Sequence, residues 1–194
     1  MRLLQTITLL TLTSSLLLAG AQSKADKELE RVIKTGKKSS QILIKTLGSK
    51  LKKRLKNGGD LKALNFCADE AYNITQKVNK KLPMGVTVKR VSRKYRSPAN
   101  APLADELAVL ESFDTLNKAN VILPKELVQK VDSKTYKYYK PLVIKNRVCL
   151  KCHGQPSKDV EFKRALAQRY PLDKAMAYKK GDLRGAVVVT VKYK

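Results

Sequence analysis

Two cysteines and a histidine stand together in the string Cys149-Leu150-Lys151-Cys152-His153. Two thiols can add across the two vinyl groups of a haem, and a two-residue spacer places both sulfurs on one side of a single helical turn. The imidazole that follows the second thiol can then bind the iron. The string therefore predicts covalent attachment of one haem c through Cys149 and Cys152, with His153, the only histidine of the chain, as an axial ligand.

Three other interpretations of this spacing explain less of it. A zinc site built from Cys67, Cys149, Cys152 and His153 has the right number of ligands, but the adjacent Cys152 and His153 would strain a tetrahedral shell. A thioredoxin-like redox pair typically follows a tryptophan and encloses Gly-Pro, whereas this chain has no tryptophan and carries Leu-Lys in the gap. A disulfide between Cys149 and Cys152 would leave the adjoining histidine without a role.

The iron would need a second axial ligand, and the sequence offers several candidates. These are the leftover thiol of Cys67, the thioethers of Met84 and Met176, and the many lysines. Cys67 falls on the apolar side of a predicted helix, where a free cysteine is equally well explained as a small buried hydrophobe. The residues alone therefore leave both interpretations of Cys67 open, with Met84 as a competitor.

The first 21 residues have the composition of an export signal. Arg2 precedes a run dominated by leucine, isoleucine and threonine, and the segment ends with Ala19-Gly20-Ala21. A charged start, an apolar middle and small residues at the exit are typical of secretory signals, and the run is too short and too poorly flanked to span a membrane permanently. We expect residues 1–21 to be removed and the protein to be periplasmic or otherwise exported.

The chain is strongly basic, with 41 Lys and Arg against 16 Asp and Glu and a formal net charge of +25. Such a charge usually indicates binding to nucleic acid, but an exported protein meets little of it. The expected anionic partners are therefore an acidic redox protein, an anionic membrane surface or the carboxylates of a bound cofactor. A solvated, mutually repelling surface explains most of the lysines equally well.

Apolar periodicity predicts helices in the first part of the chain. Residues 22–58 form a basic amphipathic segment whose apolar positions recur every three or four residues, and Asn57-Gly58-Gly59 ends it. Asp60 is expected to cap a second helix over 61–78, which carries Cys67 on its apolar stripe.

The remainder, residues 59–194, is expected to form one domain that mixes strands with helices. Strands are predicted over 86–92, 135–144 and 185–191, the last of them central and the second confined to an edge or ended by Pro141. A loop over 93–102 leads into a helix with apolar positions from Leu103 to Leu116, and a short helix is expected over 160–168. The fold class is α+β, with long N-terminal helices packed on a small antiparallel sheet that has helical insertions.

Several segments from about Leu61 onward have a pattern shared with a known family. They are Asn65-Phe66-Cys67-Ala68, Val88–Ser92, Arg96–Pro102, Tyr138–Val143, Cys149–Gly154 and Gly185-Ala186. Through these segments the chain resembles the PAS-like c-type haem family, which is catalogued mostly as a domain of unknown function and is found alone or fused to signalling modules. Before Leu61 the basic segment matches only in being helical. Ser97 departs from the family, which commonly has Asn before the proline.

The resemblance implies a PAS-like sheet and a haem iron held by His153 on one side and by Cys67 on the other. A coordinated thiolate stabilises ferric over ferrous iron and lowers the reduction potential, and reduction should weaken its bond to iron. An open position on reduced iron could then accept a diatomic gas such as CO or NO. The function expected is a redox or gas sensor.

The alternative function is a soluble electron carrier whose basic surface steers it to an acidic redox partner, with association rates that fall as salt rises. The absence of a fused output domain weakens the sensor interpretation, and the charge slightly favours the carrier. We do not expect an enzyme, because a six-coordinate haem leaves substrate no position and the chain has no second histidine to act as a distal acid or base.

The resemblance also places the loop around Arg90, Arg93 and Arg96 near the haem, where guanidinium groups suit the two propionate carboxylates. A solvated basic face is the competing explanation for these arginines. The tyrosines at 136, 138 and 139 could pack on the macrocycle, although tyrosines that alternate along a strand more often serve ordinary sheet packing.

Overall fold

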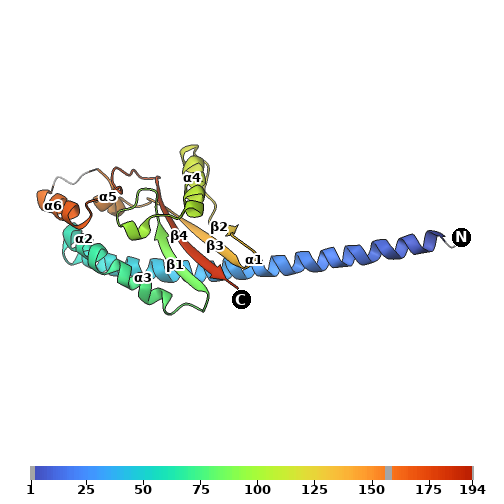
Figure 1. Ribbon diagram of the computed structural model, residues 1–194. Helices are drawn as coiled ribbons and strands as arrows, with labels where there is room; N and C mark the ends of the chain where they lie inside the picture. The colour runs from blue at the N-terminus through green and yellow to red at the C-terminus, as the bar shows by residue number, and fades with distance from the viewer. Residues whose placement is uncertain (1–2, 156–158, 194) are drawn as a thin grey trace.

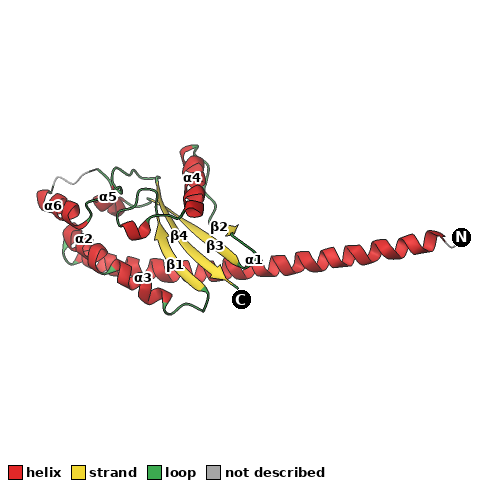
Figure 2. Ribbon diagram, viewed as in Figure 1, coloured by secondary structure: helices red, strands yellow, loops and turns green. Residues whose placement is uncertain are grey.

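The computed structural model describes residues 3–155 and 159–193 of the chain, and the side chains from residue 24 onward within those ranges (Figure 1). Its centre is an antiparallel sheet with helices on both faces (Figure 2). The strand order is β1-β4-β3-β2. The strands are β1 (Val86–Val91), β2 (Leu127–Lys130), β3 (Thr135–Val143) and β4 (Leu183–Lys192).

The helices form three groups around this sheet (Figure 1). The first three pack together against one face, α4 covers the other face, and the last two lie beyond one end of the strands beside α2. Their bounds are α1 (Leu3–Lys56), α2 (Gly59–Asp69), α3 (Ala71–Asn79), α4 (Ala104–Lys118), α5 (Arg147–His153) and α6 (Val160–Arg169). The α+β fold class expected from the sequence is confirmed.

Helix α1 is one continuous helix of 54 residues, about 80 Å long at 1.5 Å per residue. It begins far before residue 24, and its first part projects away from the sheet (Figure 1). Among the described side chains, buried positions such as Val32, Gly36, Leu43 and Leu47 recur on one side of the helix and face the core. No helix within the described residues is long and apolar enough to cross a membrane.

The alternation of side chains along the strands divides the core into two layers. On the face toward α1–α3, Tyr138 and Val189 pack with Leu43 and Phe66. On the opposite face, Tyr139 packs with residues of β4 and of α4. Tyr136, Tyr138 and Tyr139 are therefore buried in these two sheet layers, as ordinary sheet packing predicts.

The predicted helix over 61–78 is wrong as a single element, because the chain bends at Glu70 into two helices. This bend lets α2 contact α5 and α6 while α3 lies against β1. Arg54 of α1 holds the bend through an ion pair of 2.7 Å with Glu70. The expected cap is also wrong: α2 already begins at Gly59, and Asp60 lies within its first turn.

Strand β2 was not predicted, whereas the central position of the last strand is confirmed. β2 spans four residues and pairs with positions 136–139 of β3. Pro141 lies beyond the end of β2, so only β4 borders β3 at this residue, where Pro141 pairs with Ala186. The expectation that Pro141 confines this strand to an edge or ends it is wrong, because β3 lies between β4 and β2 and continues to Val143.

Gly36 allows α1 to approach the sheet closely. A Cβ at this position would come within 2.2 Å of Cγ of Tyr138, in the middle of the core. We expect Gly36→Ala to lower the free energy of unfolding by about 2–3 kcal/mol, because overpacking forces the helix or the ring to move. Urea denaturation of the full chain measures this change.

Gly48 on the same helix is a matched control, since a Cβ there would meet nothing within 4 Å. Gly48→Ala should raise stability by roughly 0.5–1 kcal/mol through helix propensity alone. Equal effects of the two substitutions would show that α1 does not pack on Tyr138 as described.

Candidate functional site

The two-cysteine string forms the short helix α5, directly after β3 and beyond the end of the sheet. Cys149 and Leu150 pack against a small apolar cluster of Ile144, Ala175 and Tyr178. His153 and Gly154 accept backbone hydrogen bonds from Tyr178 and Ala177, at 2.9 Å and 2.8 Å. The end of α5 is thus held in place by the segment that leads into β4.

The imidazole of His153 has a defined orientation. Its Nδ1 lies 2.9 Å from the carbonyl oxygen of Ala175. Because a carbonyl can only accept, Nδ1 must carry the proton, which leaves the lone pair of the neutral ring on Nε2. Burial, and after it the positive charges of Arg184 and Arg96, lower the pKa of His153 to about 3. The ring is therefore neutral at physiological pH and has one nitrogen available to a metal.

Cys149 and Cys152 are free thiols, half-buried, one helical turn apart on α5. Burial raises the pKa of Cys152 to about 11, although the charge of Arg96 acts in the opposite direction. Both thiols are accordingly available for covalent modification and are not consumed by a disulfide.

Cys67 lies on α2, partly buried against the core layer beneath α1–α3. Burial raises the pKa of its thiol, and the positive charges of Arg90 and Arg96 lower it. Its charge also raises the pKa values of Cys152 and Tyr170, which places all of these groups in one neighbourhood. The structure thus brings Cys67 to the same end of the molecule as the two-cysteine helix.

Arg96 connects the parts of this neighbourhood. Its guanidinium donates to the carbonyl of Cys152 at 2.6 Å and forms an ion pair of 3.0 Å with Asp173, in which both side chains are almost fully buried. Asp173 in turn accepts from the backbone N–H of Ala175, the residue whose carbonyl holds His153. Arg96 therefore links these segments through its Nε and Nη2, both of which donate to protein groups.

Arg90 differs from Arg96 because a donor remains unused. It projects from β1 near Cys67, and burial lowers its pKa while the charge of Cys67 raises it. Its Nε is buried without a hydrogen-bond partner among the described residues. An unpaired buried guanidinium nitrogen is costly, so this position suits an anionic oxygen of a ligand.

Two other predicted candidates lie away from the two-cysteine helix. Arg93 pairs with Asp114 at 2.6 Å and reaches Glu111 at 3.9 Å, so α4 holds it on the opposite face of the sheet. Met84 is 83% exposed in the turn before β1, at the end of that strand remote from Arg90. Met176, by contrast, lies beside Arg96, with its Sδ 3.2 Å from the guanidinium.

Four further residues around the site had no local signal in the sequence. Tyr170 lies near Arg96, whose Cζ is 5.9 Å from the ring centroid, and Asp173 pairs with the same arginine. Tyr178 presents an edge to the His153 ring at a centroid distance of 6.2 Å. Arg184 places a third guanidinium charge beside His153. Only the fold brings these residues to α5.

Ion pairs hold α2, and with it Cys67, against the neighbouring helices. Lys151 of α5 lies 3.4 Å from Asp60 at the start of α2, and Arg169 of α6 pairs with Asp69 at its end. Each exposed pair contributes only about 0.2–1 kcal/mol, so together they orient α2 more than they stabilise it. Within the described part of the chain, no three His, Cys, Asp or Glu side chains are grouped as a metal site.

Comparisons with known proteins give two matches. A profile of the Tll0287-like family, described as Tll0287, matches residues 16–192. The crystal structure of the cyanobacterial heme-protein Tll0287 is similar to this fold, with a TM-score of 0.58 and 26% sequence identity, over 87% of this chain and 96% of that chain. No curated protein matches the chain.

Proposed function

The chain belongs to the Tll0287-like family, and from this premise we propose that it is an exported, PAS-like protein that carries one covalently attached haem c and acts as a redox or gas sensor. Similarity to a cyanobacterial heme-protein supports haem binding. The string from Cys149 to His153 supports covalent attachment, since it has the residues and spacing of a c-type haem site.

The observation that carries the proposal is the hydrogen bond between Nδ1 of His153 and the carbonyl of Ala175. This hydrogen bond fixes the tautomer whose Nε2 lone pair can bind a metal, an arrangement typical of metal-binding histidines. A merely structural histidine would more often use both ring nitrogens for hydrogen bonds within the protein. When bound, the haem would supply a one-electron couple and, at reduced iron, a position for a diatomic gas.

The donor set of the described residues fits this cofactor. Cys149 and Cys152 would provide the thioether links, and His153 the first axial ligand. Cys67 would provide the second, because it is the one cysteine outside the string and its charge acts on Cys152. To bind iron, the Cys67 thiol would have to release its proton to solvent, because the thiolate is the form that coordinates a metal, and burial of the free thiol raises its pKa.

Arg90 is the propionate contact that we propose, since its buried Nε has no partner among the described residues. Arg96 already donates to the carbonyl of Cys152 and to Asp173, so its role would be to position the end of α5. Arg93 would take no part in holding the haem, because α4 carboxylates engage it.

Sensing would depend on the bond between Cys67 and iron. The charges of Arg90 and Arg96 favour the thiolate, whereas burial of the site favours the neutral thiol. A change in the oxidation state of the iron would shift the balance between thiolate and thiol. Ion pairs link the end of α2 to α1 and α6, so a displacement of Cys67 would be transmitted to these two helices.

Electron transfer to an acidic protein is the second candidate function. Exposed cations surround the two-cysteine helix, among them Lys145, Arg147 and Lys151. Basic side chains near a redox centre raise the rate of encounter with an acidic partner. This function needs no movement of Cys67, which distinguishes it from the sensor.

The test is to express the full chain in a host that matures c-type cytochromes and to purify it. We expect one haem per chain that survives denaturing electrophoresis, and a pyridine haemochrome spectrum of a haem with both vinyl groups saturated. The same preparation, reduced under CO, should show a shifted Soret band if reduced iron opens a position. Colourless protein, or protein with stoichiometric zinc, would refute the proposal.

A further inference from the structure

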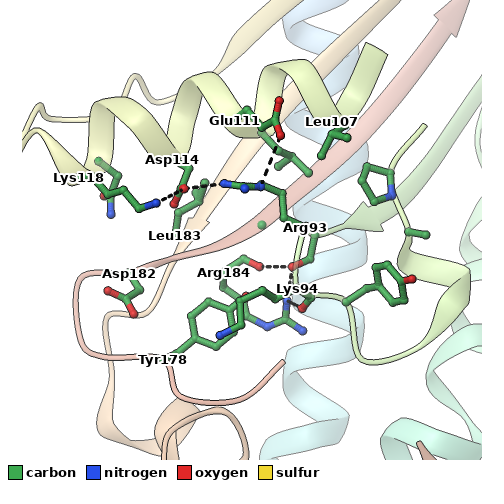
Figure 3. Close-up of a pocket in the computed structure, with 17 residues that line it drawn as sticks. Arg93, Lys94, Leu107, Glu111, Asp114, Lys118, Tyr178, Asp182, Leu183 and Arg184 are labelled. Carbon is green, nitrogen blue, oxygen red and sulfur yellow. Dashed lines mark hydrogen bonds and ion pairs between the residues drawn. The ribbon is translucent and has the colours of Figure 1, made fainter. Parts of the chain in front are cut away.

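A cavity of about 750 Å³ lies on the α4 side of the sheet (Figure 3). Helix α4 forms one wall, the segment after β1 forms another, and Tyr178 with the start of β4 closes the third. This volume falls within the range of about 300–1,000 Å³ that small-molecule sites occupy. Cys67, Cys149, Cys152 and His153 do not line it, so it is separate from the donors assigned above.

The lining combines an apolar surface with charged groups. Leu107 and Leu110 of α4 and Leu183 of β4 provide the apolar part. The charged groups come from both sides, with Arg93, Lys94 and Arg184 on the sheet side and acidic residues on α4 (Figure 3). Such a lining suits a ligand with an apolar body and one charged end.

Two of the cationic side chains that line the cavity, Lys94 and Arg184, form no ion pair with the described residues, whereas the others do. Asp114 binds both Arg93, at 2.6 Å, and Lys118, at 2.8 Å. Among the described residues, no carboxylate comes within ion-pair distance of Lys94 or Arg184. Arg184 donates to Ser92 Oγ at 2.6 Å and to the carbonyl of Lys94 at 3.1 Å, and the Lys94 ammonium donates to the carbonyl of Met176.

The two cations meet at one aromatic ring. Nζ of Lys94 lies 4.6 Å and Cζ of Arg184 lies 5.3 Å from the ring centroid of Tyr178, and Figure 3 shows the three side chains side by side. Like charges brought together repel, and burial makes the charge of Arg184 more costly still. An anion placed between them would offset both effects.

We propose that this cavity binds a small organic acid, with its carboxylate between Lys94 and Arg184 and its apolar body against Leu107, Leu110 and Leu183. Asp114 on the opposite wall is already paired with Arg93 and Lys118, so the apolar body of the ligand, and not a second charged group, would meet that side of the cavity. The class of ligand expected is therefore a monocarboxylate with an aromatic or aliphatic body.

Tyr178 connects this cavity with His153. Its backbone N–H donates to the carbonyl of His153 at 2.9 Å, and the two rings meet edge to face at 81°. The charge of Arg184 also acts on His153. A regulatory consequence follows if the chain carries haem as proposed above. A bound carboxylate would neutralise positive charge beside the histidine ligand and thereby lower the reduction potential of the haem.

Calorimetric titration of the purified full chain with 1-naphthoate tests the site, with the uncharged 1-naphthamide as the matched probe. We expect saturable binding of one naphthoate per chain and binding of naphthamide at least tenfold weaker. Lys94→Met should weaken naphthoate binding about tenfold, the loss expected for one charge-assisted contact. Lys118→Met is the control, because that lysine is paired with Asp114 and its side chain is 73% exposed.

The outcomes separate this inference from the proposed function. Absence of saturable naphthoate binding, or equal affinity in the wild type, Lys94→Met and Arg184→Met, would overturn the site. Binding without any change in haem midpoint potential would overturn the link through Tyr178 alone. If the purified protein holds no haem, the proposed function fails, yet the titration still tests the cavity.

Discussion

Replacement of both Cys149 and Cys152 by serine is expected to abolish covalent haem attachment. Serine keeps the size of the side chain but cannot form a thioether with a vinyl group. Both thiols lie on the short helix α5, which contacts the rest of the protein through Cys149, Leu150 and the backbone of its last turn, and serine fills nearly the same space as Cys149. The substitutions should therefore remove the links while leaving the fold intact.

Haem staining after denaturing electrophoresis measures this loss, and the expected signal is zero. Cys67→Ser is the matched control, because it also removes one thiol but none that belongs to the string. The control should keep the full staining of the wild type. A double variant that still carries haem through denaturation would show that attachment does not use these cysteines.

Much of the fold follows from local patterns in the sequence. The β-branched run from Val187 to Val191 indicates a central strand, because only a strand buried on both faces tolerates such continuous apolarity. The periodicity of residues 24–56 likewise identifies the part of α1 that packs on the sheet. Each of these two patterns recurs at several positions along its own strand or helix, so it can be recognised without knowledge of tertiary contacts.

The errors arise where tertiary contacts override a local pattern. The apolar stripe from Leu61 to Val78 reads as one helix, yet the chain bends at Glu70 so that its two halves face different partners. Strand β2 has only four residues and a mixed pattern of burial, and it is specified by its pairing with β3. Neither feature has a signal within its own residues.

The same distinction applies to the site. The string from Cys149 to His153 can be recognised because its chemistry requires adjacent residues. Arg184 and Asp173, in contrast, reach the site from segments outside α5. The role of Asp173 becomes visible only through its ion pair with Arg96 in the folded structure. The three arginines at 90, 93 and 96 look alike in sequence, and only the fold separates them.

The arginines that do reach the site act on Cys67 and His153 in different ways. Arg90 and Arg96 favour the charged form of the Cys67 thiol, which is the form that binds a metal. Arg96 and Arg184 disfavour protonation of His153, which again leaves the metal-binding form. One cluster of positive charge thus prepares both proposed ligands, although one is an acid and the other a base.

Removal of the Cys67 thiol is therefore expected to have the largest effect on redox behaviour. Cys67→Ala should raise the midpoint potential of the haem by the order of 0.1 V or more, within the range of about 0.8 V that axial ligands cover. The reason is the loss of a negative thiolate that stabilises ferric iron. Potentiometric titration followed by absorbance measures the shift, and the ferric spectrum should change with it.

Met84→Ala is the matched control, because Met84 is the competing ligand from the sequence and is 83% exposed at the far end of β1. This variant should keep the wild-type potential and spectrum. Covalent haem should persist in both variants, since Cys149 and Cys152 are unchanged. An unaltered ferric spectrum in Cys67→Ala, together with an altered one in Met84→Ala, would transfer the ligand role to the methionine and require the turn before β1 to reach α5.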